Sequence, residues 1–176
     1  MNSLASYITS KFPNAVHRDS NGQDVIYLAK EDYKQAAIEL KENCDVVMCL
    51  DVTVADYLGT SDRIHVEGVA AERFEVVAQF ISHKRNERIR LIVQVNDHEA
   101  HVDTLADIFP GVNFGEREAY DMFGVVFDGH PDLTRILMPE EWEGYPLRKD
   151  DSSARIPVNF TDDLPKGEQA EVGEFS

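Results

Sequence analysis

Apolar residues recur at helical spacing in four stretches of the chain, which begin near residues 3, 31, 102 and 113. Three or four residues separate one apolar position from the next, which is the period of a helix with one buried face. The second stretch predicts a helix over residues 31–43. Ser3 is expected to cap the first helix, while Asn113 and Glu116 form a capping-box pair for the last. Gly124 is expected to end that last helix.

Other stretches carry the signal of β-strands. Residues 46–54 are rich in β-branched and apolar side chains, which predicts a central strand buried on both faces. Residues 74–81 and 89–95 predict a hairpin, since alternate residues of its second arm are apolar. Residues 24–29 predict a further strand and 64–66 a short partner strand. The order of elements indicates an α+β fold, with helices packed on a mostly antiparallel sheet.

Regular periodicity fades after Gly124, although large apolar side chains continue. Five of the seven prolines lie beyond this point, so the segment cannot bury its apolar side chains in a helix or sheet of its own. It either packs back on its own domain as an ordered loop or lies across another protein. We therefore expect an α+β domain over residues 1–124, an extended Pro-rich partner-docking arm over 125–160, and an acidic flexible tail over 161–176.

The formal net charge of −16 and the sequence pI of about 4.6 exclude several partners. A nucleic-acid binder needs a basic surface that releases counterions, and anionic lipid attracts basic segments. Neither nucleic acid nor a lipid surface is therefore an expected direct partner. No apolar run approaches the ~20 residues that span a bilayer, and no secretory signal is visible. We expect a cytosolic chain that reaches a membrane only through a membrane-bound partner.

The chain lacks the ligands that redox chemistry needs. It has two cysteines, Cys44 and Cys49, whereas an iron–sulfur cluster usually takes four thiolates. Two buried thiols are the expected state of these residues. No G-x-G-x-x-G dinucleotide fingerprint, Walker A loop or H-E-x-x-H pair is present. We therefore expect no cofactor, no metal and no catalytic residue in this chain.

Charged and large apolar residues are most densely mixed between Glu116 and Gly124. Arg117 and Asp121 are four residues apart and can pair on one helix face. Two functional interpretations compete: a carboxylate–histidine metal site, and a structural and docking element whose charges orient the following loop. A solvated helix face is the third, plainest interpretation. The metal site would use these residues: Glu118, Asp121, His130 and Asp132.

A second charged stretch, residues 83–90, is basic in an otherwise acidic chain. It lies at the tip of the predicted hairpin. It could meet an acidic partner, but an ordinary charged turn that blunts aggregation is at least as good an explanation.

The longest motif runs from Glu116 to Asp150 without a gap. It reads Glu-Arg-Glu-x-x-Asp-Met-Phe-Gly, then Gly-His-Pro-Asp-Leu-x-Arg-Ile-Leu-x-Pro, then Trp-x-Gly-x-Pro-Leu-Arg-Lys-Asp. This resembles the signature of the C subunit of respiratory complex I, the proton-translocating NADH:quinone oxidoreductase, in its bacterial type. The likeness covers about residues 44–160 and is strongest in the last third. Ten signature positions are expected to serve docking or structure: Glu116, Arg117, Glu118, Asp121, His130, Asp132, Arg135, Trp142, Arg148 and Lys149.

The resemblance implies a role that the residues alone do not give. Such subunits are peripheral, lie on the cytoplasmic face of the bacterial cell membrane, and carry no cofactor. They pack against the quinone-site subunit (the D subunit), near the subunit with the terminal iron–sulfur cluster (the B subunit). The complex passes electrons from NADH through FMN and iron–sulfur clusters to quinone, with FMN and the clusters in partner subunits. Residues 128–150 would then be the main docking segment.

Two alternatives belong to other functional classes. One is a stand-alone metal-dependent hydrolase that uses Glu118, Asp121 and His130. The other is an adaptor, either in a ferredoxin-linked relative of the complex or on an unrelated partner. The first requires three ligands to meet in space, whereas the second requires only an apolar arm that its own domain does not cover.

Overall fold

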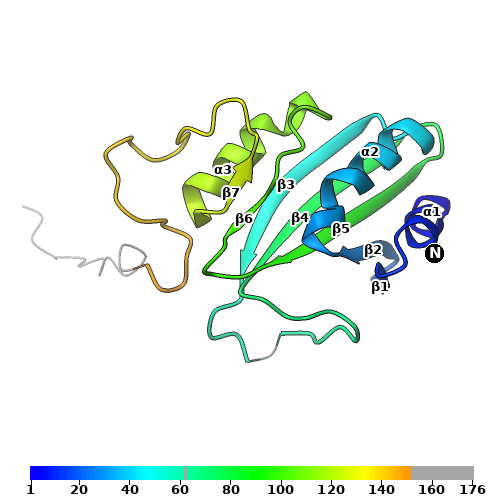
Figure 1. Cartoon of the computed structure of the whole chain (residues 1–176), viewed down its shortest axis with the longest axis horizontal. Coiled ribbons are helices and arrows are strands. Elements are labelled where there is room, and N and C mark those ends of the chain that lie inside the picture. Colours follow the sequence, from blue (N-terminus) through cyan, green and yellow to red (C-terminus); the bar gives the residue numbers. More distant parts are fainter. Residues whose placement is uncertain (62, 152–176) are drawn as a thin grey trace, which may run out of the picture.

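The computed structural model describes residues 1–61 and 63–151. Three α-helices, two 3₁₀ turns and seven strands lie in this part of the chain. Figure 1 shows their arrangement. In chain order they are α1 (Ser3–Lys11), β1 (Val16–Ser20), β2 (Gln23–Leu28), η1 (Lys30–Asp32), α2 (Tyr33–Asn43), β3 (Met48–Asp56), β4 (Phe74–Ser82), β5 (Glu87–Val95), β6 (His101–Asp103), η2 (Pro110–Val112), α3 (Asn113–Phe123) and β7 (Val126–Asp128). The last part of the expected arm and the expected acidic tail over 161–176 lie outside the described residues.

The main sheet has five strands in the order β1-β2-β5-β4-β3. All neighbouring strands are antiparallel except β2 and β5, which pair in parallel with Val25 opposite Arg90. A second, two-stranded sheet pairs β6 with β7 in parallel. The expected α+β class with a mostly antiparallel sheet is therefore confirmed, and so is the hairpin of β4 and β5.

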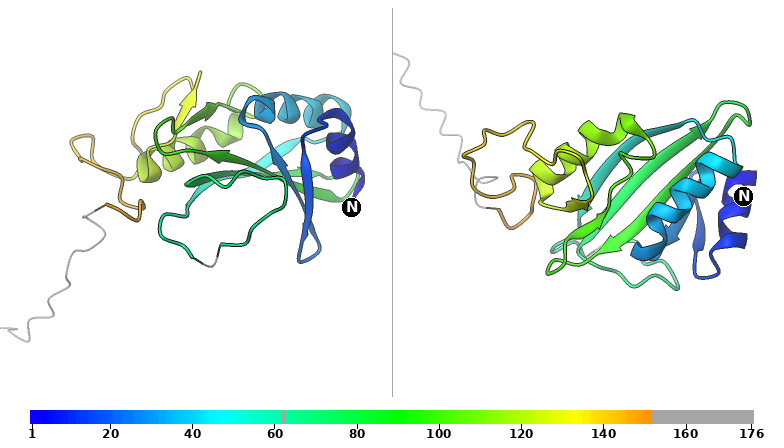
Figure 2. Two further views of the ribbon diagram at one scale, coloured as in Figure 1. Left: turned by 60° about the horizontal axis from the view of Figure 1, so that its bottom comes forward. Right: turned by 45° about the horizontal axis from the view of Figure 1, so that its top comes forward.

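The two faces of the main sheet differ in what covers them. The helices α1, α2 and α3 lie on one face, whereas the loop between β3 and β4 passes over the other (Figure 2). The helix-covered face holds the main core, in which alternate residues of β4 and β5 are buried. On the other face, Val66 and Val69 of the loop pack on Val25, Tyr27 and Ile92.

Three predicted elements differ in the structure. The apolar strand β3 lies at an edge of the main sheet and is not buried on both faces, since its residues Met48 and Leu50 are exposed. Residues 64–66 form no strand. The helix expected near residue 102 is absent, since Val102 belongs to β6 and the apolar residues after it are buried in a turn.

Both predicted helix caps are also wrong. Asn2, not Ser3, caps α1, and its side chain accepts a hydrogen bond from the amide of Ala5 at 2.9 Å. Glu116 does not form a capping box in α3, because its carboxylate is turned into the core. The prediction that Gly124 ends α3 is correct: it adopts a left-handed conformation with φ +72°, which glycine tolerates without strain.

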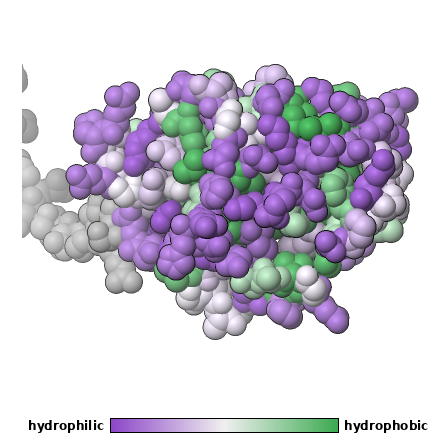
Figure 3. All heavy atoms as spheres, in the orientation of Figure 1, coloured by the Kyte–Doolittle hydropathy of each residue, from purple (hydrophilic) through white to green (hydrophobic). Residues whose placement is uncertain are grey.

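The surface is mainly polar, as Figure 3 shows for one face of the molecule, where apolar groups gather in small patches. None of the helices in the described ranges is both long and apolar enough to cross a bilayer. Both cysteines are free and buried. Burial raises the pKa of the Cys49 thiol to about 12, so this thiol is neutral at ordinary pH.

Candidate functional site

The signature residues meet around α3, whose outer side carries the docking segment (residues 128–150). The segment leaves β7, crosses the helix and returns to the end of β3 (Figure 1). The first four residues assigned to the arm, 125–128, belong structurally to the domain. Val125 and Phe127 are fully buried in its core, and β7 pairs with β6.

Asp121 fixes the middle of the docking segment. Its Oδ2 accepts hydrogen bonds from three successive backbone amides, those of Ile136 (3.0 Å), Leu137 (2.7 Å) and Met138 (2.9 Å). Its Oδ1 accepts from the guanidinium of Arg135 at 2.6 Å. Burial alone would raise the pKa of this carboxyl, but the hydrogen bonds outweigh burial and hold the pKa below its usual range. Asp121 is therefore a charged anchor for the loop.

Arg117 does not pair with Asp121 as the helical spacing suggested. It reaches across to the docking segment, where it donates to the carbonyl of Thr134 at 3.0 Å and to that of Arg135 at 3.1 Å. A third bond goes to the Thr134 hydroxyl at 2.9 Å. Arg135 takes the expected place of Arg117 beside Asp121. Arg117 thus reaches from α3 to the docking segment, and Arg135 reaches from the docking segment to α3.

Glu116 lies at the base of the docking segment and is completely buried. Its carboxylate accepts hydrogen bonds from the hydroxyl of Thr104 and from the amide of Leu105 at 2.7 Å. Burial raises the pKa of Glu116 to about 7, although these hydrogen bonds work in the opposite direction. Nε2 of His130 lies 3.8 Å from the same carboxylate.

The hydrogen bonds of His130 define its tautomer. Nδ1 accepts from the amide of Asp132 at 3.1 Å, so in the neutral ring the proton must lie on Nε2. Nε2 can then donate to the carbonyl of Asn113 at 3.3 Å. The histidine therefore joins the first residues of the docking segment to the start of α3.

The end of the docking segment packs against the end of α3. Arg148 donates to the carbonyl of Phe123 and lies 4.7 Å from the ring centre of Tyr145. A Cβ atom on Gly124 would lie 2.5 Å from the Tyr145 ring and 2.7 Å from the Arg148 guanidinium. A side chain larger than glycine would therefore push the segment away at this point.

A second set of ion pairs closes the segment onto the main sheet. Arg73 donates to Asp56 at 3.0 Å, to Asp97 at 2.9 Å and to Asp150 at 2.5 Å. Asp56 also accepts from the amide of Lys149 at 2.9 Å. Hydrogen bonds to Asp56, first from Arg73, outweigh its burial and lower its pKa. Both ends of the docking segment are therefore attached to the domain.

Sequence reasoning missed Arg73, Asp56 and Asp97. They lie at the ends of β3, β4 and β5, and no motif links them to the signature. The only available signal was an arginine beside an apolar strand, which is too common to interpret.

Several apolar side chains of the docking segment remain exposed to solvent. Leu137 is 59% exposed, Leu147 54% and Ile136 38%, whereas Leu133 packs against the core. Trp142 is half-buried, and its indole nitrogen is inaccessible to solvent yet has no hydrogen-bond partner in the described part of the chain. The sequence left two possibilities for this segment, an ordered loop on its own domain or a segment that lies across another protein. The structure shows an ordered loop on its own domain that also exposes apolar side chains.

The residues of the alternative metal site do not come together. Asp121 is bound to Arg135 and three amides, while Glu118 and Asp132 are exposed. His130 faces Glu116 instead. Across residues 1–61 and 63–151, no three His, Cys, Asp or Glu side chains form a group that could hold a metal ion.

A family model for the 30 kDa subunit of the respiratory-chain NADH dehydrogenase matches residues 26–155. The chain belongs to this family. The match begins within β2 and includes the rest of the main sheet except β1, as well as the whole docking segment, so the signature and most of the fold that presents it are shared by the 30 kDa subunits.

Two relatives show how this chain compares with other members of the family. The C subunit of NADH-quinone oxidoreductase from Herpetosiphon aurantiacus is 35% identical over 160 residues, which cover 90% of this chain and 88% of the relative. The C/D subunit of NADH-quinone oxidoreductase from Yersinia enterocolitica is 40% identical over 136 residues, or 77% of this chain. The match spans only 22% of that longer protein.

A solved structure agrees with the fold. A trypsin-resistant fragment of Nqo5 superposes with a TM-score of 0.62 at 30% sequence identity, covering 73% of this chain and 95% of the fragment. The chain is thus a subunit of an enzyme complex of the NADH-quinone oxidoreductase type.

Proposed function

We propose that this chain is a cofactor-free peripheral-arm subunit that scaffolds the quinone-site subunit (the D subunit) of a proton-translocating NADH:quinone oxidoreductase. In this proposal the complex carries electrons from NADH through FMN and iron–sulfur clusters to quinone. FMN and the clusters reside in partner subunits. The docking segment supplies the contact with the quinone-site subunit, and the B subunit, which carries the terminal cluster, lies nearby. The chain is held at the cytoplasmic face of the membrane through the complex.

One observation supports this proposal most directly. Asp121 and Arg117 use their hydrogen bonds to hold a loop that nevertheless exposes Ile136, Leu137 and Leu147. A loop that only completed its own core would turn these side chains inward, since burying one is worth roughly 1.5–3 kcal/mol. A rigid loop that presents apolar side chains loses little conformational entropy when a partner covers it.

The relatives support the choice of partner. In Yersinia enterocolitica the matching segment is part of a longer protein, whose name joins the C and D subunits. Two subunits that occur in one polypeptide in some organisms are good candidates for neighbours where they are separate chains.

The test is to change an exposed docking side chain without harming the fold. Leu137→Asp should reduce co-purification with the quinone-site subunit at least tenfold, because it places a charge in an apolar contact. Its side chain is 59% exposed, so the melting temperature of the isolated chain should hardly change. Ile64→Asp is the matched control, since Ile64 is 65% exposed but lies in the β3–β4 loop.

Equal losses with both variants would mean that added charge, rather than the docking segment, weakens assembly. Full assembly of Leu137→Asp would rule out Leu137 as part of the contact. The ferredoxin-linked adaptor is distinguished by its donor: it would co-purify with a ferredoxin-oxidising partner in place of the NADH-oxidising one.

A further inference from the structure

The β3–β4 loop covers only part of the sheet face opposite the helices. There Val66 and Val69 of the loop pack on Val25, Tyr27 and Ile92. Nearer the β4–β5 hairpin, the same face carries six residues that we call the arginine patch. They are Met48 and Leu50 of β3, Ile81 of β4, Arg88 and Arg90 of β5, and Arg18 of β1.

The strand register brings the side chains of the arginine patch together. Arg18 lies opposite Val25 and Val25 opposite Arg90, so these three residues form one row across β1, β2 and β5. Arg88 lies opposite Ile81 on β4. Because residues two apart on a strand share a face, Arg88 points to the same side as Arg90. The three arginines therefore lie on one side of the sheet, with an apolar side chain beside them.

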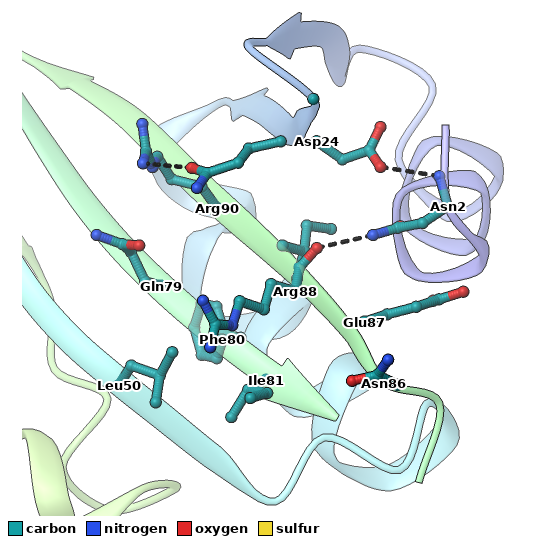
Figure 4. Close-up of a pocket in the computed structure, with 13 residues that line it drawn as sticks. Asn2, Asp24, Leu50, Gln79, Phe80, Ile81, Asn86, Glu87, Arg88 and Arg90 are labelled. Atoms are coloured by element: carbon teal, nitrogen blue, oxygen red, sulfur yellow. Dashed lines mark hydrogen bonds between the residues drawn. The ribbon is translucent and has the colours of Figure 1, made fainter. Parts of the chain in front are cut away.

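A hollow of about 470 Å³ lies in the arginine patch. Figure 4 shows Leu50 and Ile81 next to each other in its lining, with Arg88 and Arg90 along the neighbouring strand β5. Met48 and Leu50 are 47% and 44% exposed. Soluble proteins rarely leave neighbouring apolar side chains uncovered without a function, and arginine and methionine are enriched where proteins meet. The patch therefore has the composition of a contact surface.

The three arginines of the patch have no carboxylate partner within residues 1–61 and 63–151. Elsewhere in the chain, arginines are paired: Arg63, for example, lies 2.7 Å from the carboxylate of Glu75. Arg90 instead donates to the side-chain carbonyl of Gln23 at 2.9 Å, which is a neutral acceptor. The positive charge of the patch is therefore not neutralised by the side chains that the structure describes.

Two acidic residues border the hollow, but both are bound toward α1 and β1. Asp24 accepts a hydrogen bond from the amide of Asn2 at 2.9 Å and lies 2.5 Å from Nε2 of His17. Glu87 accepts from the hydroxyl of Ser3 at 2.7 Å. These bonds leave the arginines without a counter-charge. In a chain of net charge −16, such a cationic patch favours an acidic partner.

We propose that the arginine patch binds an acidic segment of another protein subunit of the complex. Carboxylates of that segment pair with Arg88 and Arg90, and one of its apolar side chains covers Leu50 and Ile81 in the hollow. A guanidinium group holds a carboxylate through two parallel hydrogen bonds, which suits this contact. The net charge of −16 disfavours both nucleic acid and a second copy of the chain, since it repels them.

This contact goes beyond the one proposed for the docking segment. The docking segment lies on the outer side of α3, and the helices cover the opposite face of the main sheet (Figure 2). Both surfaces can therefore be occupied at once, and the chain would join two neighbours. The inference needs only that the chain is a subunit of the complex. It does not depend on which subunit the docking segment contacts.

A photo-cross-linker in the intact complex tests the proposal. The residue p-benzoylphenylalanine takes the place of Leu50, the complex is purified and irradiated, and mass spectrometry identifies the linked peptide. The expected result is one peptide of another subunit, with two or more acidic residues. Leu58 is the matched control position, because it is 43% exposed but lies in the β3–β4 loop. A cross-linker at Leu58 should not reach the same peptide.

Charge variants show whether the arginines hold that peptide. Arg88→Glu/Arg90→Glu should lower the yield of the cross-link roughly tenfold or more, because like charges then face each other. Lys11→Glu/Lys34→Glu changes the net charge equally on the helix side and should leave the yield intact. Arg88→Gln/Arg90→Gln should give a smaller loss, and it serves if charge reversal disturbs the fold. Lysines in place of the acidic residues of the linked peptide should restore the yield with Arg88→Glu/Arg90→Glu.

Four results would overturn the proposal. The first is a complex in which position 50 links to no other chain. The second is a linked peptide without acidic residues, and the third is a yield that both arginine double variants leave unchanged. The fourth is a link to a second copy, to nucleic acid or to lipid. Normal assembly of Leu137→Asp would contradict the function proposed for the docking segment, but it would leave this cross-link in place.

Discussion

The protonation of Glu116 should make the free energy of unfolding depend on pH. Burial raises its pKa from 4.5 to about 7, so the folded protein holds a proton that the unfolded chain releases between these values. The unfolded state binds fewer protons in this window. The free energy of unfolding therefore falls as the pH rises from about 4.5 to 7, and this contribution is constant above it.

Glu116→Gln removes this titration, and the measurement is denaturant unfolding at pH 5, 6, 7 and 8. The wild type should lose on the order of 2–3 kcal/mol relative to the variant between pH 5 and pH 8. The comparison cancels the other carboxylates, which both proteins share. Parallel curves for the two proteins would show that Glu116 is ionised throughout.

Arg117 is the residue whose three hydrogen bonds hold Thr134 and Arg135. Arg117→Ala should lower the free energy of unfolding by roughly 1–3 kcal/mol, as expected for lost hydrogen bonds to a charged group. Arg117→Lys should recover only part of this, since a single ammonium cannot reproduce the fork. A thermal melt of Arg117→Ala that matches the wild type would contradict the role of this side chain.

At the scale of elements, the junction between α3 and the docking segment depends on Gly124. Gly124→Ala combines backbone strain at φ +72° with a Cβ placed 2.5 Å from Tyr145. Gly22→Ala is the matched control, because Gly22 has φ +80° but nothing within 4 Å of its Cβ position. The control should cost about 1 kcal/mol, and Gly124→Ala clearly more, as measured by denaturant unfolding. Equal costs would show that the segment yields easily at this point.

The elements that the sequence predicted well are those with local rules. In the hairpin of β4 and β5 every second residue is apolar on the face that packs against the helices, and α3 ends at a glycine. Whether β3 lies at the centre or at the edge of the sheet could not be predicted from such local rules. An apolar strand is equally compatible with the centre of a sheet and with an edge that packs against a helix, and only the strand order of the whole sheet decides.

The sequence predicted which residues belong to the site, but not which of them contact one another. The motif brought Arg117, Asp121 and Arg135 into one group, yet helical spacing suggested that Arg117 pairs with Asp121. In the structure Asp121 binds the docking segment instead, because three backbone amides of that segment need an acceptor and Asp121 supplies it. The ion pairs of Arg73 form only because the end of the docking segment comes back to the main sheet. No local sequence pattern predicts that course of the chain.

At the scale of the whole molecule, the docking segment should matter more for assembly than for folding. Trp142 is half-buried, and its indole N–H lacks an acceptor in the described part of the chain. Trp142→Ala should therefore weaken association with the quinone-site subunit more than it lowers the melting temperature. Co-purification and a melt of the isolated variant measure the two effects.

Trp142→Phe is the control for this substitution, because it keeps most of the apolar area but removes the N–H group. It should assemble better than Trp142→Ala. A Trp142→Ala chain that assembles normally, or one that simply unfolds, would assign the indole to the core of this domain.

The parallel pairing of β2 with β5 has a consequence for the order in which the nascent chain folds. Val25 leaves the ribosome long before its partner Arg90 has been made. The strands β3, β4 and β5 are neighbours both in sequence and in the sheet, so they can pair without closing a long loop. The hairpin of β1 and β2 can join only after them. The first strands to be synthesised are therefore the last to enter the sheet.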